Sequence, residues 1–151
     1  MTIRWRAAAS FAACALIAAC NSDVPVSAVA EITRPDLRIT ITRVATHPFL
    51  ARFNLKVSVT TSSGCTATSD LFPDTGGVSR RNIYRGTMDR LYVMGQFDLR
   101  RFDPRTCAID LMEFRSLEPG LQFLGAFDTD LSGHWTFFSP DMRAERPFQP
   151  L

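Results

Sequence analysis

The sequence has few residues of the kinds that form metal sites or catalytic centres. Its 151 residues include only two histidines, His47 and His134, and four cysteines. It contains neither the Gly-x-Ser-x-Gly segment that presents a nucleophilic serine nor a glycine-rich phosphate loop. His134 lies near acidic and serine residues in the sequence, but a catalytic triad needs hydrogen-bonding geometry that sequence proximity does not supply. We therefore expect a protein that is not an enzyme and that needs no cofactor.

The sequence also lacks an apolar segment long enough to cross a membrane. The run of apolar or small residues from Ala7 to Ala19 has only 13 residues, whereas a membrane-spanning helix needs about 20. Arg4 and Arg6 precede this run. A short basic segment followed by a short apolar one is typical of an export signal. We therefore expect residues 1–19 to be a cleaved signal peptide.

A short motif lies at the end of this segment. Ile17-Ala18-Ala19-Cys20 resembles the lipobox of bacterial lipoproteins, in which an aliphatic residue and two small residues precede a cysteine. The resemblance is confined to the signal region and says nothing about the domain that follows. It implies cleavage before Cys20, diacylation of the Cys20 thiol and acylation of the new N-terminus, for example with palmitate. More than one acyl chain would give a stable membrane anchor.

The residue after the cysteine bears on location. Asn21 stands where an aspartate retains many Gram-negative lipoproteins at the inner membrane, so the resemblance implies a lipid-anchored, periplasm-facing protein of the outer membrane. An ordinary secretory signal with a coincidental cysteine is the alternative.

The chain carries no excess of charge after the signal. Arg4 and Arg6 are the only charged residues before Cys20, so the remaining chain has 15 basic and 15 acidic residues. A nucleic-acid-binding domain would carry a basic surface. We therefore expect no nucleic-acid partner.

Two cysteines remain for the folded domain. Cys14 lies in the signal and Cys20 is the predicted lipidation site, which leaves Cys65 and Cys107. Cysteine pairs in an oxidising envelope compartment form disulfides, so we predict a Cys65–Cys107 disulfide. Two free thiols or a metal pair are the alternatives, and the two distant histidines make a poor metal set.

Apolar residues at alternate positions predict β-strands along most of the domain. The predicted strand segments are residues 37–42, 53–59, 91–100, 107–114 and a final hairpin over 121–137. The segment near 104–117 also suits a short helix. We therefore predict a mainly β fold, an antiparallel β-sandwich or small barrel, over residues 37–139. Residues 20–36 are predicted to be a lipidated tether, and residues 140–151 an extended C-terminal tail.

The stretch from Thr61 to Asn82 shows no sustained alternation and is longer than most connections in compact domains. Recognition often uses loops held by a rigid scaffold. We therefore predict that residues 70–90 form part of a partner-binding surface. Its candidate contact residues are Phe72, Arg81, Tyr84 and Arg85, because aromatic and arginine side chains are enriched at interface hot spots.

One segment partly matches a calcium-binding loop. Asp128, Asp130 and Ser132 alternate as oxygen ligands do, and Gly133 occupies the sixth position. The twelfth position is Ser139, where a bidentate glutamate is expected. We therefore prefer a polar hairpin turn and predict no metal.

Taken together, these patterns favour a membrane-anchored envelope lipoprotein whose non-catalytic β-rich domain binds another envelope protein in a structural or assembly role. The alternative is a periplasmic inhibitor of a hydrolase such as a lysozyme or protease. Small disulfide-bonded β lipoproteins include such inhibitors, but the likeness is one of size and fold class only. A hydrolase is a weaker third hypothesis.

Overall fold

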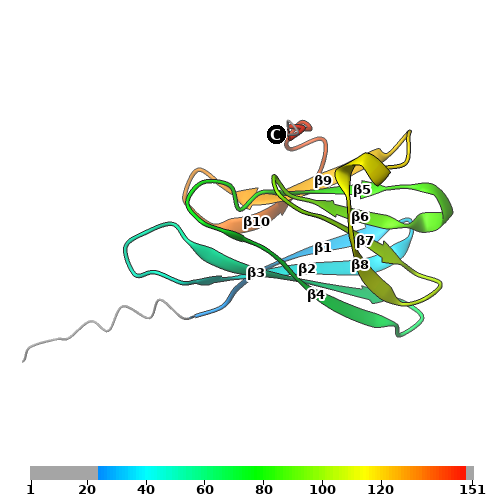
Figure 1. The fold of residues 1–151 in the computed structure, drawn as a ribbon, viewed down its shortest axis with the longest axis horizontal. Helices are drawn as coiled ribbons and strands as arrows, with labels where there is room; N and C mark the ends of the chain where they lie inside the picture. The colour runs from blue at the N-terminus through cyan, green and yellow to red at the C-terminus, as the bar shows by residue number, and fades with distance from the viewer. Residues whose placement is uncertain (1–23, 149–151) are drawn as a thin grey trace, which may run out of the picture.

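The computed structural model describes residues 24–148, which form two facing antiparallel β-sheets (Figure 1). The strands are β1 (Val26–Thr33), β2 (Asp36–Ala45), β3 (Phe53–Thr61), β4 (Thr66–Asp74), β5 (Arg81–Arg85), β6 (Leu91–Met94), β7 (Leu99–Asp103), β8 (Ala108–Met112), β9 (Gln122–Thr129) and β10 (Trp135–Phe138). One sheet has the order β1-β2-β3-β4 and the other β10-β9-β5-β6-β7-β8. The predicted mainly β sandwich is confirmed. The predicted signal peptide and Cys20 lie outside the described residues.

The core lies between the two sheets, and alternation places its side chains there. In β3, Leu55, Val57 and Val59 are buried while the residues between them are more exposed, as period-two patterning predicts. The indole N–H of Trp135 in β10 donates a hydrogen bond of 2.9 Å to the carbonyl of Ile41 in β2. This bond joins the two sheets inside the core.

The predicted disulfide is confirmed. Cys65 lies just before β4 and Cys107 just before β8, and their Cα atoms are 6.0 Å apart. Because β4 and β8 are edge strands of different sheets, the bond closes one side of the sandwich.

The domain begins earlier than predicted. Residues 26–33, which we expected to belong to the tether, form β1 and pair with residues 36–43 of β2. Ala28, Ala30 and Ile32 are buried at alternate positions. Two of these three residues are alanines, whose small size makes the alternation weak in the sequence.

Two further predictions of strand position are wrong. The stretch expected to be irregular contains β4, which pairs with β3 and turns Ala67 and Leu71 inward. The single strand expected over residues 91–100 is a hairpin, because β6 and β7 pair with Met94 opposite Leu99. Gly95 lies in the turn between them and is not a strand bulge.

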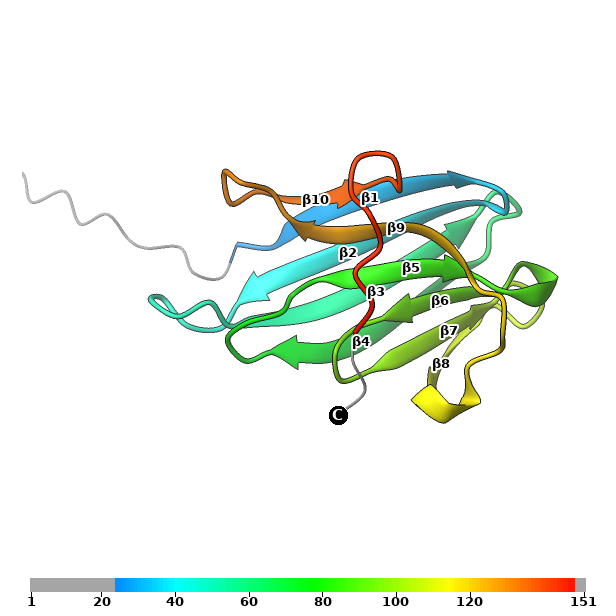
Figure 2. The same ribbon diagram turned by 90° about the horizontal axis from the view of Figure 1, so that it is seen from above.

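The outer face of the six-stranded sheet is covered by two irregular segments. Phe114, Leu117 and Leu121, from the connection between β8 and β9, pack against a cluster that includes Tyr84 and Tyr92. Phe148 of the C-terminal tail packs against the same cluster, and Figure 2 shows the tail crossing this sheet. The segment near 104–117 forms β8 followed by a single 3₁₀ turn, Phe114–Ser116, and residues 24–148 contain no α-helix.

One end of the sandwich carries the start of the described chain together with four connections. These are the loop between β2 and β3, the loop between β4 and β5, the turn between β6 and β7, and the turn between β9 and β10. The first two and the last lie at the left in Figure 1. We refer to this end as the N-terminal end.

Candidate functional site

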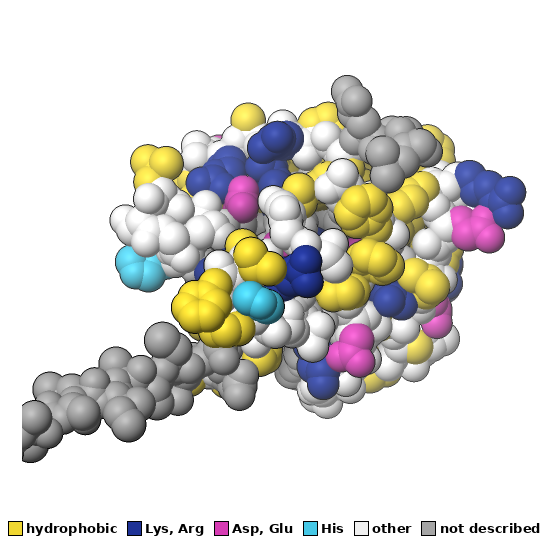
Figure 3. All heavy atoms as spheres, turned by 60° about the vertical axis from the view of Figure 1, so that its left-hand side comes forward, with side chains coloured by type: hydrophobic (Ala, Val, Ile, Leu, Met, Phe, Trp, Pro, Cys, Tyr) yellow, Lys and Arg dark blue, Asp and Glu magenta, His cyan; other side chains and the backbone are white. Residues whose placement is uncertain are grey.

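An exposed apolar patch lies at the N-terminal end, where β4 meets the β6–β7 turn. The rings of Phe72 in β4 and Phe97 in the turn have centroids 5.6 Å apart and planes inclined at 53°. Both side chains are about half exposed, at 46% and 50%, and Val78 in the β4–β5 loop is exposed at 38%. We call Phe72, Val78 and Phe97 the Phe72–Phe97 patch. Figure 3 shows hydrophobic side chains gathered beside basic ones on this end of the molecule.

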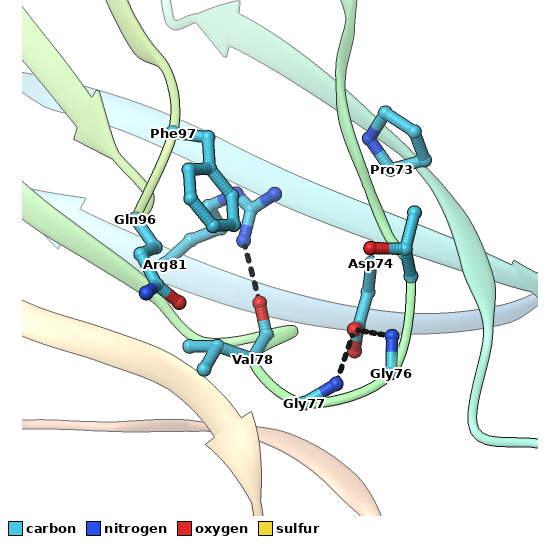
Figure 4. A pocket seen from close by; sticks show the side chains of 9 residues that line it. Pro73, Asp74, Gly76, Gly77, Val78, Arg81, Gln96 and Phe97 are labelled. Carbon is cyan, nitrogen blue, oxygen red and sulfur yellow. Dashed lines mark hydrogen bonds between the residues drawn. The ribbon is translucent and has the colours of Figure 1, made fainter. Parts of the chain in front are cut away.

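A pocket of about 200 Å³ opens beside the patch (Figure 4). In Figure 4, Phe97 and Gln96 lie on one side of it and Pro73 and Asp74 on the other. The lining residues are Pro73, Asp74, Thr75, Gly76, Gly77, Val78, Arg81, Gln96 and Phe97. The pocket therefore lies between the end of β4 with the β4–β5 loop and the β6–β7 turn, the segments that also carry the patch.

The buried Arg81 side chain links the β4–β5 loop to β4 through hydrogen bonds. The side chain is only 3% exposed, and its Nη1 donates hydrogen bonds to the carbonyls of Val78 and Ser79 at 3.2 and 3.1 Å. Its Nη2 donates to the carbonyl of Phe72 at 2.6 Å. Burial lowers the pKa of the Arg81 guanidinium, and Asp98 opposes this effect. Arg81 therefore fixes the loop that carries Val78 to the strand that carries Phe72.

Asp98 connects the β6–β7 turn to β4. Its Oδ2 accepts a hydrogen bond of 2.8 Å from the backbone N–H of Phe72, and its Oδ1 lies 3.7 Å from Arg81 Nε. Gly95 makes this approach possible, because a Cβ atom there would lie 2.6 Å from Asp98 Oδ1 and 2.8 Å from the Arg81 guanidinium carbon. A larger residue at position 95 would push the turn away from β4.

Asp74 shapes the rest of the β4–β5 loop. Its Oδ1 accepts hydrogen bonds from the N–H groups of Gly76 and Gly77 at 2.9 and 2.8 Å, and its Oδ2 accepts one from the Ser79 hydroxyl. Burial acts to raise the pKa of the Asp74 carboxyl, but these hydrogen bonds outweigh it and the pKa is lowered. The loop is thus held in one shape by an ionised side chain.

The structure places the four predicted contact residues in different environments. Phe72 is exposed, as a contact residue must be. Arg81 and Tyr84 are buried at 3% and 5% exposure, so their prediction as direct partner contacts is wrong. The Tyr84 hydroxyl instead donates a hydrogen bond to Glu145 of the tail. Arg85 lies at the other end of the sandwich and donates hydrogen bonds to the Arg34 carbonyl and to Gln122 Oε1.

Sequence reasoning missed Phe97 and Val78 as exposed members of the surface. Phe97 continues the alternation of Leu91 and Val93, so it resembles an inward-facing strand residue. The only contrary signal is Gly95, two positions earlier, which is also compatible with a turn.

The residues of the partial calcium motif are engaged in turn and tail contacts. Asp130 Oδ1 accepts hydrogen bonds of 2.8 Å from the N–H groups of Ser132 and His134. Asp128 Oδ2 lies 2.6 Å from Arg143 Nη1. No group of three or more histidine, cysteine, aspartate or glutamate side chains within residues 24–148 is arranged to hold a metal ion.

Comparison with known proteins gives no match: no protein-family model, no curated protein and no solved structure is similar to this chain at a significant level. None of the helical segments within residues 24–148 has the length and hydrophobicity needed to span a membrane.

Proposed function

We propose that this protein is a lipid-anchored envelope protein whose β-sandwich binds another envelope protein through the Phe72–Phe97 patch. The observation that supports this most directly is that two aromatic rings, one in β4 and one in the β6–β7 turn, are left exposed side by side on backbone that buried polar groups hold in place. Exposed aromatic clusters of this kind are typical of protein-binding hot spots.

The way the patch is held favours binding over a merely exposed surface. Association loses affinity when loops must be ordered on contact. Here Arg81, Asp98 and Asp74 already fix the connections through hydrogen bonds to their backbones. A partner would therefore bury the patch with little ordering cost.

The anchor is tested at Cys20. Replacing Cys20 by serine should release the protein from membranes or leave it unprocessed, because no thiol would remain to carry acyl chains. Mass spectrometry of the wild-type protein should find acyl groups on Cys20. An unacylated mature protein would contradict the proposed anchor. It would not affect the proposed binding surface, which is tested separately.

Binding is tested by crosslinking in the envelope. A photoreactive amino acid at position 97 should crosslink to a specific envelope protein. The double variant Phe72→Ala/Phe97→Ala should weaken capture of that protein by roughly tenfold or more, with little change in thermal stability, because both rings are half exposed.

Leu111→Ala is the matched control, because Leu111 is also an exposed apolar side chain but belongs to the edge strand β8. Equal loss of capture in both variants would reject the patch. Capture of a lysozyme or protease, with inhibition of its activity, would favour the inhibitor alternative over the assembly role.

A further inference from the structure

The two most exposed large apolar side chains lie at loop tips on the N-terminal end. Phe49, in the β2–β3 loop, is 86% exposed, and Leu131, in the β9–β10 turn, is fully exposed. Leu50, beside Phe49, is also exposed. These tips are separate from the Phe72–Phe97 patch, since none of their residues lines its pocket.

Arg43 contacts the bases of both loops and is paired with the beginning of β1. Arg43 is paired with Val26, the first residue of β1. Its guanidinium donates hydrogen bonds to Thr129 Oγ1 at 3.1 Å and to the Gly133 carbonyl at 3.2 Å, at the two sides of the β9–β10 turn. It also lies over the Phe53 ring at 4.7 Å, where the β2–β3 loop ends.

The β2–β3 loop is ordered with its apolar side chains pointing outward. His47 Nδ1 accepts hydrogen bonds of 3.1 Å from the N–H groups of both Phe49 and Leu50. The Arg52 N–H donates to the Leu50 carbonyl at 2.7 Å. Between Thr46 and Arg52 the loop has one arginine and no acidic residue, a charge that suits an anionic surface.

We infer that Phe49, Leu50 and Leu131 dock on the lipid bilayer that holds the anchor, with their side chains in the headgroup and upper acyl region. This inference rests on the proposed lipid anchor at Cys20. Val24 is only four positions after Cys20, and four residues span at most about 14 Å. The N-terminal end therefore stays next to the bilayer. Apolar loop tips on this end can enter the membrane interface without a longer tether.

The test measures the depth of each tip. Lipidated protein carrying Phe49→Trp or Leu131→Trp is reconstituted into vesicles of phosphatidylethanolamine and phosphatidylglycerol, with and without bromine on the upper acyl chain. Bromine should quench the added tryptophan by roughly twofold or more if the tip enters the interface. Met88→Trp is the matched control, because Met88 is also exposed but follows β5 at the opposite end of the sandwich. Trp135 is buried and adds the same background to each sample.

Quenching at both tips and not at position 88 supports the inference. If the protein floats with the vesicles but the tip variants are quenched no more than Met88→Trp, the anchor stands and the docking is rejected. Missing acyl groups on Cys20 would overturn the anchor and the docking together. A second chain seated on the tips would give a dimer in sedimentation without bromine-dependent quenching, which also overturns the inference.

Discussion

At the scale of single residues, buried polar groups determine the shape of the candidate surface. Arginine and tyrosine are enriched at interfaces, which made Arg81 and Tyr84 reasonable contact residues from sequence. Their burial depends on partners far away in the chain, Asp98 for Arg81 and Glu145 for Tyr84. Because no local pattern encodes these pairings, the sequence pointed to Phe72, which is exposed, but not to Phe97 beside it or to the side chains that support both.

The role of Asp74 can be tested through the pH dependence of stability. The pKa of this carboxyl is lowered from its ordinary value of 3.8 in the folded protein. Its stabilising effect is therefore complete above 3.8 and is lost as the pH falls through the lowered folded value. We expect Asp74→Asn to reduce the free energy of unfolding by about 2 kcal/mol at neutral pH, measured by urea denaturation.

The difference between wild type and Asp74→Asn should shrink in strong acid, where the wild-type carboxyl is also protonated. Asp70→Asn is the control, because Asp70 lies in the same strand but is exposed and pairs only loosely with Lys56, at 3.7 Å. A pH-independent difference for Asp74→Asn would show that its charge does not hold the loop.

At the scale of elements, strands were predictable where large apolar residues alternate. This holds for β2, β3, β9 and β10, whose core residues include Ile39, Val57, Phe127 and Trp135. It fails for β4, where Ala67 and a half-buried Ser69 precede Leu71 on the inward side. A strand with small or polar inward residues gives little contrast between its two faces.

The β6–β7 hairpin was missed for a different reason. Its turn has four residues, from Gly95 to Asp98. Residues paired across a hairpin face the same side of the sheet, so Met94 and Leu99 share the outer face whereas Val93 faces the core between the sheets. The four-residue turn therefore shifts the alternation by one position. Because all four residues of β6 are buried, apolar residues occupy both of its faces and the shift is not visible in the sequence, where Gly95 is the one sign of a turn.

The disulfide was predictable from the cysteine count and the expected compartment, but its structural role was not. Cys65 and Cys107 are 42 positions apart, and closing a loop of this size stabilises a fold by about 4 kcal/mol in the chain-entropy model. The structure adds that the bond joins the edges of two different sheets. It therefore also limits how far the sheets can separate on that side.

At the scale of the whole molecule, the outer face of the six-stranded sheet is covered, whereas the outer face of the four-stranded sheet carries exposed and mostly polar side chains. The core occupies the inner faces of both sheets, and the β8–β9 connection and the tail cover the outer face of the larger sheet. The tail is fastened by polar contacts as well: the Asn82 side chain donates to the Arg146 carbonyl at 3.0 Å, and the Arg80 guanidinium donates to the Ala144 carbonyl at 3.4 Å. We predicted an extended tail, but its role as a cover depends on these distant partners.

The cover can be tested through the titration of Tyr84. Burial, followed by the hydrogen bond to Glu145, raises the pKa of Tyr84 from its ordinary value of 10.0 to about 12. Deleting the chain from Met142 onward should expose the hydroxyl and move the pKa back toward 10.0. Absorbance titration in a Tyr92→Phe background isolates Tyr84, because the chain has only two tyrosines.

The raised pKa also fixes the sign of the effect on stability. Because the folded state holds the Tyr84 proton more tightly, this contribution to stability is complete below pH 10.0 and is lost as the pH rises toward about 12. Truncation of the tail should reduce this loss of stability at alkaline pH. Glu145→Gln keeps the tail but removes its charge, so it should lower the Tyr84 pKa by less than truncation does, since burial is the larger cause. An unchanged Tyr84 pKa after truncation would show that the sheet buries the hydroxyl without the tail.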